Sequence, residues 1–152
     1  MPRLWRYGLV LSGDRAIAQD LAQATALRAL ERSSQFRPGT RLDHWCFSIL
    51  SSIWKNDRRA HKVRMGLGQV PAEEAGLVDP APGADVNILA SRVLSLAAQL
   101  PEAQREAIFL VYVEGFSYAE AAKRMEIPIG TVMSRLANGR RRLKQTMGED
   151  DV

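Results

Sequence analysis

The chain has 152 residues, of which 46% are hydrophobic and 25% are charged, and it carries a net charge of +4. This length suits one ordinary domain or two very small ones, and the composition is typical of a soluble, globular chain. Because no run of about 18 apolar residues occurs, no membrane-spanning helix is expected. The apolar run behind the basic N-terminus is too short for a signal peptide. The single cysteine, Cys46, has no partner for an internal disulfide, which favours the reducing cytoplasm.

Charge is distributed in blocks along the chain. Residues 1–64 carry twelve basic and five acidic residues, and residues 65–87 carry four acidic and no basic ones. Residues 88–147 carry nine basic and five acidic residues, and residues 148–152 add three acidic ones. Two basic blocks around an acidic segment favour two surfaces for a polyanion such as nucleic acid. A basic surface that only keeps the protein soluble is the alternative.

The middle of the chain has the composition of a linker. Residues 65–85 contain four glycines, three prolines and no basic residue, without helical or alternating periodicity. This composition predicts a flexible linker, and its length favours a domain boundary over a loop inside one domain. We therefore expect one domain over residues 1–64, a linker over 65–87, a second domain over 88–147 and an acidic tail over 148–152.

The first block is predicted to be helical. Residues 14–32 are rich in alanine and leucine and contain no glycine or proline, which favours a helix. The sequence Arg-Pro-Gly-Thr at residues 37–40 predicts a turn, and Asp43 is placed to cap the helix that follows. Because each block has only about 60 residues and a marginal core, we expect two compact units of three or four helices each, in an all-α fold.

The second block has clearer helix signals. Pro101 suits the first turn of a helix, and Gly115 suits its end. Ser117 and Glu120 have the spacing of a capping box. This pattern predicts a short helix over residues 118–125.

A longer basic helix is expected after this short one. Pro128 cannot continue the short helix, and the next helix is predicted over residues 131–147. A short helix, a tight turn and a longer basic helix are typical of the helix-turn-helix motif that binds DNA. An ordinary helical hairpin is the alternative.

One face of this last helix is predicted to be buried and the opposite face exposed. At about 100° per residue, the apolar stripe comprises Val132, Leu136, Leu143 and Met147. The polar residues opposite it can exchange hydrogen bonds with base edges: Ser134, Asn138, Arg141 and Gln145. Because the first residues of such helices usually reach the bases, the preferred candidates for base recognition are Thr131, Ser134, Arg135 and Asn138. Arg140 lies beside the buried stripe and Arg142 on the other flank, where each suits a phosphate group or a protein partner.

Both blocks resemble one known family. Residues 100–144, LPEAQREAIFLVYVEGFSYAEAAKRMEIPIGTVMSRLANGRRRLK, resemble region 4 of bacterial sigma factors of the extracytoplasmic-function (ECF) group. The first block, with GDRAIAQDLAQATALRAL and FRPGTRLDHWCFSIL, resembles region 2 of the same family. The resemblance implies a protein that binds core RNA polymerase at the β′ clamp and the β flap, recognises promoter DNA and starts transcription. It also implies an anti-sigma factor as a regulatory partner.

The resemblance implies which residues would touch DNA. Region 4 would bind the upstream (−35) element through Thr131, Ser134, Arg135, Asn138, Arg141 and Arg142. Region 2 would hold the downstream (−10) element as it opens, and a loop between its last two helices, around residues 50–56, would take an unstacked base. The polar candidates there are Ser51, Ser52, Lys55 and Asn56, and the phosphate-binding candidates are Arg58, Arg59, Lys62 and Arg64. Trp45 matches a family tryptophan and is expected in the core, whereas the role of Trp54 stays open.

The polymerase contact is also implied by the resemblance. The helix with Asp20, Gln23, Thr25 and Arg28 corresponds to the family's main contact with the β′ subunit. Ala24 and Ala26 replace the Glu and Phe that usually flank the threonine, which is expected to weaken this contact. Ser51 and Ser52 replace a common Arg-Asn pair, and Met133 replaces a frequent arginine. Only about ten residues precede LSGDR, so the first helix of region 2 is expected to be short.

Other classes of function compete with a sigma factor. A sigma-like decoy that captures an anti-sigma factor would explain Ala24 and Ala26, and a stand-alone helix-turn-helix repressor would explain the second block but not the first. An RNA-binding module would need a stacking platform that the sequence does not indicate. An enzyme is not expected, because His44 and Cys46 have no further ligands at zinc spacing and no serine lies in a nucleophile motif. No cofactor or metal is expected.

Overall fold

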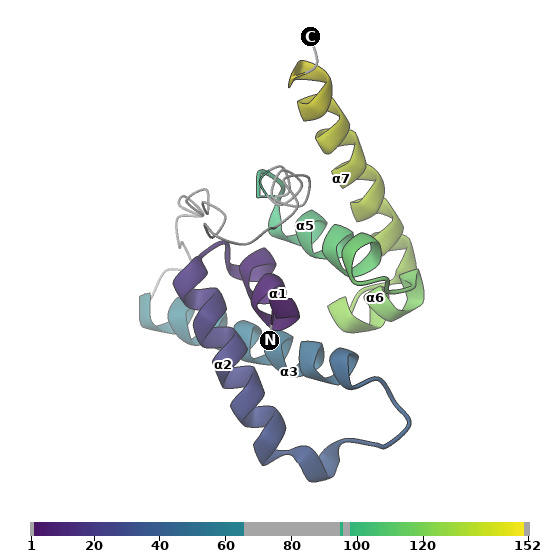
Figure 1. Cartoon of the computed structure of the whole chain (residues 1–152). Coiled ribbons are helices and arrows are strands. Elements are labelled where there is room, and N and C mark those ends of the chain that lie inside the picture. Colours follow the sequence, from purple (N-terminus) through teal and green to yellow (C-terminus); the bar gives the residue numbers. More distant parts are fainter. Residues whose placement is uncertain (1, 66–94, 96–97, 151–152) are drawn as a thin grey trace. The chain divides into compact units, whose positions relative to one another are not determined.

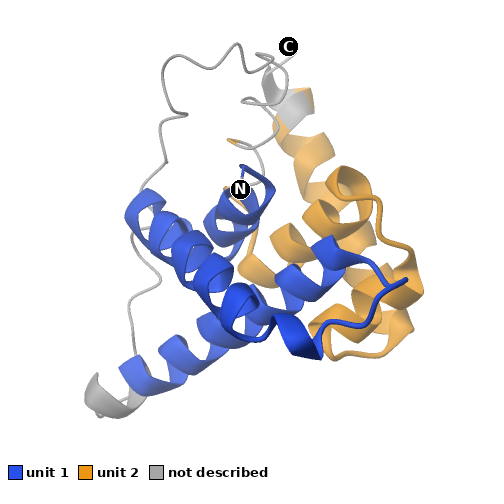
Figure 2. Cartoon of the chain, turned by 60° about the horizontal axis from the view of Figure 1, so that its bottom comes forward, with its two compact units in different colours: residues 1–76 blue, residues 77–152 orange. Residues whose placement is uncertain are grey.

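The chain divides into two compact units, residues 1–76 and 77–152 (Figure 2). A computed structural model describes residues 2–65, 95 and 98–150 (Figure 1). The predicted linker, apart from Met65, lies outside the described residues. Every regular element in the described part is helical, as an all-α fold requires. Among the described helices, none combines the length and the apolar character needed to cross a membrane.

The described part of unit 1, residues 2–65, contains three α-helices and one short 3-10 turn. Helix α1 spans Pro2–Ser12, α2 spans Arg15–Glu31, the turn η1 spans Ser33–Gln35 and α3 spans Leu42–Met65. Gly13, with φ of 71°, reverses the chain between α1 and α2, and the Asp14 side chain caps α2 by accepting from the Ile17 amide at 3.0 Å. All three α-helices pack against one another.

The core of unit 1 is formed where these three helices meet. The ring of Tyr7 on α1 meets the ring of Phe47 on α3 edge-on, with 5.1 Å between centroids, and both side chains are buried. Leu21 and Leu50 are buried from α2 and α3. Gly8 lets α1 approach α2 closely, because a Cβ atom there would lie 3.1 Å from the Ala18 Cα atom.

Asp43 ties α3 to the rest of unit 1 and does not occupy the cap position that the sequence predicted. It lies in the first turn of α3, one residue inside the helix. Its carboxylate accepts from Arg3 at 2.8 Å, from Arg41 at 2.9 Å and from the His44 amide at 2.9 Å. Partial burial opposes ionisation, but the hydrogen bonds from Arg41, Arg3 and His44 outweigh it and hold the pKa of Asp43 well below its usual range.

Unit 2 contains the helix-turn-helix motif. Helix α5 spans Glu102–Ile108 and continues as a π-helical turn, η2, over Phe109–Val113; α6 spans Tyr118–Met125 and α7 spans Ile129–Asp150. The predicted capping box is confirmed, since the Ser117 hydroxyl accepts from the Glu120 amide at 3.0 Å and the Glu120 carboxylate accepts from the Ser117 amide at 2.9 Å. Helix α6 ends at Glu126, which has φ of 58°.

Helix α7 is longer than the sequence predicted at both ends. It begins two residues earlier, at Ile129, because the Pro128 carbonyl already accepts from the amides of Thr131 and Val132. Its last turn includes residues 148–150, which the sequence assigned to an acidic tail. The helix packs on α5 and α6, with Val132 and Leu136 fully buried.

Candidate nucleic-acid and polymerase interfaces

The predicted outward face of α7 is exposed, and its predicted buried face is in the core. Val132 and Leu136 are buried and Leu143 is half-buried, whereas the side chain of Met147 lies outside the described residues. The opposite face comprises four exposed polar residues: Ser134, Asn138, Arg141 and Gln145. The structure therefore confirms the orientation of this helix.

Hydrogen bonds on this face leave donors free to point outward. Arg141 donates to the Asn138 side-chain oxygen at 3.3 Å, so the Asn138 amide group and the other guanidinium N–H groups still face solvent. The Ser134 hydroxyl donates to the Gly130 carbonyl at 3.1 Å and can still accept. Amide and guanidinium groups are the side chains that most often contact adenine and guanine in the major groove.

The flanks of α7 differ from one another. On one flank Thr131 and Arg135 are half-buried and Arg142 is exposed. On the other flank the Arg140 guanidinium donates to the Tyr112 hydroxyl of η2. The hydrogen bond to Tyr112 raises the pKa of Arg140 above its ordinary value, with Tyr118 adding to the effect. Arg140 is thus held against its own unit, away from the outward face.

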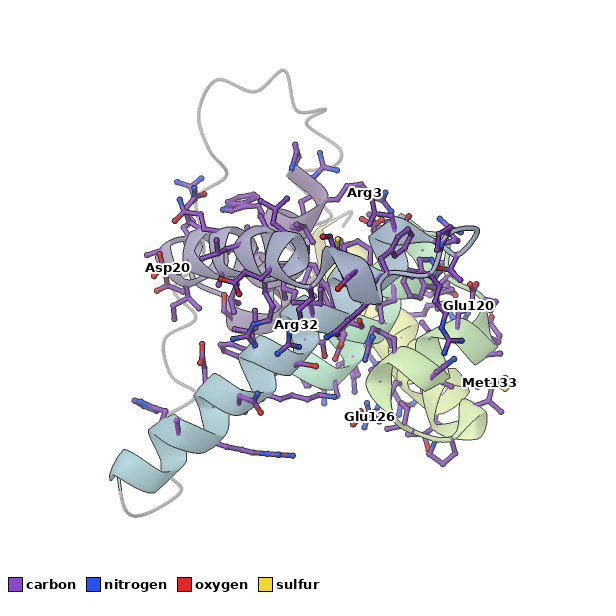
Figure 3. The ribbon with its side chains drawn as sticks, turned by 90° about the horizontal axis from the view of Figure 1, so that it is seen from below. Arg3, Asp20, Arg32, Glu120, Glu126 and Met133 are labelled. Carbon is purple, nitrogen blue, oxygen red and sulfur yellow. The ribbon has the colours of Figure 1, made fainter. Side chains whose placement is uncertain are left out.

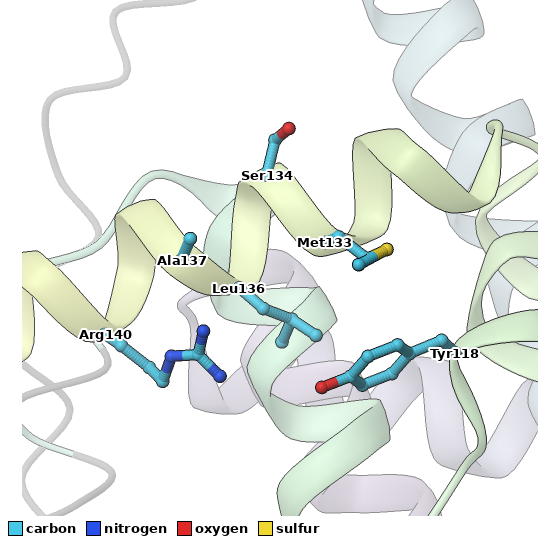
Figure 4. A pocket seen from close by; sticks show the side chains of 6 residues that line it. All are labelled: Tyr118, Met133, Ser134, Leu136, Ala137 and Arg140. Atoms are coloured by element: carbon cyan, nitrogen blue, oxygen red, sulfur yellow. The ribbon is translucent and has the colours of Figure 1, made fainter.

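A shallow hollow lies on the Arg140 side of α7. Its volume is about 360 Å³. Figure 4 shows the ring of Tyr118 on α6 facing Leu136, and the Arg140 guanidinium pointing toward the same space. The lining residues are Tyr118, Met133, Ser134, Leu136, Ala137 and Arg140. This hollow was not predicted from the sequence, because Tyr118 and Arg140 are brought together only by the packing of α6 on α7.

The expected base-binding loop at residues 50–56 does not exist in unit 1. These residues belong to the continuous helix α3, because nothing between Leu42 and Met65 breaks a helix. Ser51 is only 1% exposed and lies in the core, so it is not placed to bind a base. The connection between the last two α-helices lies earlier, over residues 32–41, around the predicted Arg-Pro-Gly-Thr turn and Gly39 with φ of 89°.

The C-terminal half of α3 presents a polar and basic surface instead. Ser52, Asn56 and Arg59 recur at helical spacing on one exposed face. Lys55 is half-buried, Arg58 is exposed, and the Arg58 guanidinium lies 5.5 Å from the centre of the Trp54 ring. The side chains of Lys62 and Arg64 lie outside the described residues.

Two aromatic side chains stabilise the connection between α2 and α3. The rings of Phe36 and Trp45 lie 5.3 Å apart at a tilt of 49°, and both residues are half-buried. Trp45 thus packs against the connection itself, which agrees with a packing role for this residue. The exposed residues Arg37, Thr40 and Arg41 surround the turn.

Helix α2 presents an outward face that includes two of the four residues predicted to bind polymerase. Asp20 and Gln23 are exposed, and Figure 3 shows Asp20 at the outer edge of unit 1. Arg28 is half-buried. Thr25 is fully buried and its hydroxyl donates to the Leu21 carbonyl at 2.7 Å, so its position is inside the core and not on the predicted contact surface.

Two leucines on the same face of α2 were missed in the sequence. Leu27 is 60% exposed and Leu30 is 76% exposed. Together with Asp20 and Gln23 they follow the spacing i, i+3, i+7 and i+10, which is the signal that marks one face of a helix. The two leucines therefore form a short apolar strip on the exposed face of α2.

The described residues include no group of three or more His, Cys, Asp or Glu side chains that could hold a metal ion. Burial, and next the nearby Asp43 carboxylate, raise the pKa of the Cys46 thiol. A raised pKa disfavours the thiolate that metal binding or nucleophilic attack requires.

Comparisons with known proteins agree with this geometry. A model of sigma-70 region 2 matches residues 1–64, and a model of sigma-70 region 4 matches residues 90–143. The ECF RNA polymerase sigma factor EcfG of Rhodopseudomonas palustris is 33% identical over 150 residues, which cover 99% of this chain and 82% of that protein. The chain belongs to the ECF sigma factors.

Further relatives of this sigma factor support the assignment. The ECF sigma factor SigL of Mycobacterium tuberculosis is 33% identical over 96% of this chain and 83% of its own. The sigma factor RpoE of Bartonella quintana, solved with the anti-sigma factor NepR, has a TM-score of 0.80 and 29% identity, covering 97% of this chain and 91% of that one. CnrH, solved with the cytosolic domain of CnrY, shares the fold at a TM-score of 0.62 and 20% identity. Sigma factors are transcription initiation factors, so the family agrees with the role predicted from the sequence.

Proposed function

We propose that this sigma factor binds core RNA polymerase in the cytoplasm and directs it to promoters that α7 recognises at the upstream element. The observation that carries this proposal is the exposed polar face of α7 in a helix-turn-helix unit. The contact residues we propose are Thr131, Ser134, Arg135, Asn138, Arg141 and Arg142. Residues 1–64 and 88–147 would act as the two functional domains, joined by the segment over residues 65–87.

For the downstream element we propose a revised surface on unit 1. Residues 36–41 take the place of the loop expected at 50–56, since they belong to the connection over residues 32–41 that joins the last two α-helices. An exposed turn with two arginines beside a pair of aromatic rings suits an unstacked base and its phosphates. The face of α3 would guide the backbone through Ser52, Lys55, Asn56, Arg58 and Arg59, with Lys62 continuing the series.

For polymerase we propose the outward face of α2. Asp20, Gln23 and Arg28 supply polar contacts, and Leu27 and Leu30 supply apolar area that water would otherwise cover. Ala24 is exposed on the same helix, in place of the usual glutamate, so one charged contact is lost there. The binding free energy gained by burying Leu27 and Leu30 offsets part of the binding free energy lost with the charged contact.

Regulation by an anti-sigma factor is part of the proposal. The similar sigma factor RpoE of Bartonella quintana was solved in complex with the anti-sigma factor NepR. A partner that covers α7 or the face of α2 would prevent promoter or polymerase binding. Such a partner would bind the apolar area that Leu27 and Leu30 form on α2 and would thereby compete with polymerase.

Run-off transcription tests the function. Core polymerase with this protein should transcribe a subset of templates from a promoter library randomised at both elements, and core polymerase alone should not. Absence of any promoter-dependent transcript would favour the decoy, for which the small side chain of Ala24 at the polymerase-contact helix is the motivating observation. Tight, specific DNA binding by the isolated chain would favour a repressor, because each unit of a sigma factor has a small contact area.

A further inference from the structure

Helix α7 carries an exposed apolar row beside its polar face. Ile129, Met133 and Ala137 follow one another at intervals of four residues, so they form one row along the helix. Ile129 is 48% exposed, Met133 is 52% exposed and Ala137 is half-buried. Figure 3 shows Met133 at the outer edge of unit 2. The apolar row therefore lies on the surface, unlike the neighbouring residues Val132 and Leu136.

The position of the apolar row points to DNA as the group that covers it. The row lies in the first half of α7, next to Ser134 and Asn138 of the polar face, and the first residues of a recognition helix are those that enter the major groove. Arg141 follows Ala137 at an interval of four residues and Arg140 shares this flank of α7, so the surroundings of the row are basic. A basic surround suits a polyanion and disfavours an apolar protein surface, which would bury those charges at a cost.

Only one feature of the major-groove floor is apolar. The C5-methyl group of thymine projects there, whereas the other base edges present hydrogen-bond donors and acceptors. Met133 has a flexible, unbranched side chain that can follow the position of a methyl group. Met133 lines the hollow of about 360 Å³ beside α7, which is large enough to admit a methyl group (Figure 4).

We propose that Met133, with Ala137 beside it, recognises the C5-methyl group of a thymine in the upstream promoter element. This inference rests on the proposed function and names the base that the apolar row selects. The tie between Arg140 and Tyr112 supports it, because the arginine that shares this flank is engaged with a hydroxyl of its own unit. The Arg140 guanidinium therefore does not compete with Met133 for the base.

Exchange of single thymines for uracils tests the proposal, since uracil lacks only the methyl group. The probe is the best template from the randomised library, transcribed by core polymerase with this protein. We expect one upstream-element position at which uracil lowers the initial rate of transcription about threefold to fivefold at limiting template, the effect of one buried methyl group. Uracil at the other upstream thymines should have little effect.

Variants of Met133 link this effect to the side chain. Met133→Gln, similar in length but polar, should transcribe thymine and uracil templates at equal rates, and Met133→Leu should retain the difference. Val113→Ala, which shortens an apolar side chain 50% exposed elsewhere in unit 2, should also retain it. Far-UV circular dichroism establishes that each variant is folded.

The outcomes separate this inference from the proposed function. Absence of a transcript from every template would refute the sigma-factor function itself. Normal transcription without any uracil-sensitive upstream position would overturn the thymine contact alone. If Met133→Gln lowered thymine and uracil templates equally while preserving their ratio, the apolar row would contact polymerase and the inference would be wrong.

Discussion

The Arg140 guanidinium donates a hydrogen bond to the Tyr112 hydroxyl, joining α7 to the π-helical turn 28 positions earlier in the chain. Both groups lie at the surface, so the bond fixes the direction of the Arg140 side chain and contributes little to core packing. Three consecutive arginines at 140–142 therefore have three different roles. Arg140 is held by its own unit, Arg141 faces outward next to Asn138, and Arg142 lies on the other flank.

Substitution of Arg140 should affect the fold more than base preference. Arg140→Met removes the donor to Tyr112, so the midpoint of thermal unfolding should fall slightly while the ranking of upstream elements stays unchanged. Thermal melting and sequencing of transcribed library templates measure the two quantities. A changed base ranking with unchanged melting would show that Arg140 touches DNA bases.

Substitutions on the polar face should change specificity. Asn138→Ala and Arg141→Ala each remove hydrogen bonds to base edges, so each should alter preference at particular upstream positions by about 1–3 kcal/mol. Arg142→Ala should lower affinity for all sequences alike and reduce its salt dependence. Competition binding with holoenzyme at two salt concentrations measures both effects. Equal and sequence-independent losses from all three variants would contradict the assigned face.

The cluster around Asp43 makes stability depend on pH. Because the folded-state pKa lies below that of the unfolded chain, the carboxylate contributes stability that is complete above the unfolded pKa of about 4 and fades as the pH falls from there toward the folded value. The side chain is partly exposed, so Asp43→Asn should lower the free energy of unfolding by only about 1 kcal/mol at pH 7 and by less near pH 3. Urea unfolding at both pH values measures this change, with the exposed Asp57→Asn as control. If Asp43→Asn lowered the free energy of unfolding more at the acidic pH than at pH 7, the expected pH dependence would be wrong.

Close packing of α1 on α2 should make Gly8 intolerant of a side chain. A Cβ atom there would lie 3.1 Å from the Cα atom and 3.2 Å from the carbonyl oxygen of Ala18, both in the backbone. Gly8→Ala should therefore destabilise the protein by about 1–3 kcal/mol, as overpacking does. Gly130→Ala, where nothing lies within 4 Å of the added atom, should be neutral or stabilising. Urea unfolding measures the stability of both variants, and an unchanged stability of Gly8→Ala would contradict the close approach of Gly8 to Ala18.

The buried position of Thr25 leads to a distinction among the polymerase-contact candidates. Thr25→Val keeps the volume and loses only a hydrogen bond within α2, so affinity for core polymerase should not change. Leu27→Ala should weaken binding about tenfold, because full burial of a leucine side chain is worth about 1.5–3 kcal/mol and Leu27 is 60% exposed before binding. Gln23→Ala removes an exposed polar group and should weaken binding less. Fluorescence titration of labelled protein with core polymerase measures the affinities. A large effect of Thr25→Val alone would show that α2 rearranges on binding.

Local rules predicted much of unit 2 from the sequence. Ser117 and Glu120 fix the start of α6 through bonds between near neighbours, Pro128 precedes the first turn of α7, and the buried stripe of α7 follows from helical spacing alone. The π-helical turn at Phe109–Val113 was not predicted, because its shifted hydrogen bonds, such as Glu114 amide to Phe109 carbonyl, have no sequence signal of comparable strength.

Unit 1 shows where such rules fail. Thr25 and Ser51 are polar and were assigned to surfaces, yet both are buried, because helices that pack on two sides turn even polar residues inward. The expected loop at residues 50–56 came from the family resemblance, while the residues themselves favour an unbroken helix. The turn at residues 37–40, by contrast, followed directly from proline and glycine.

The continuity of α3 has a mechanical consequence. Its 24 residues form a rod of roughly 36 Å, fastened at one end by Asp43 and carrying the polar and basic face at the other. The end that we propose to face DNA belongs to the same unbroken helix as Phe47 in the core, so it cannot adjust independently of the Tyr7–Phe47 contact. In that proposal the nucleic acid deforms to fit the protein during promoter opening, and the stiffness of this one element adds to the energy that separates the strands.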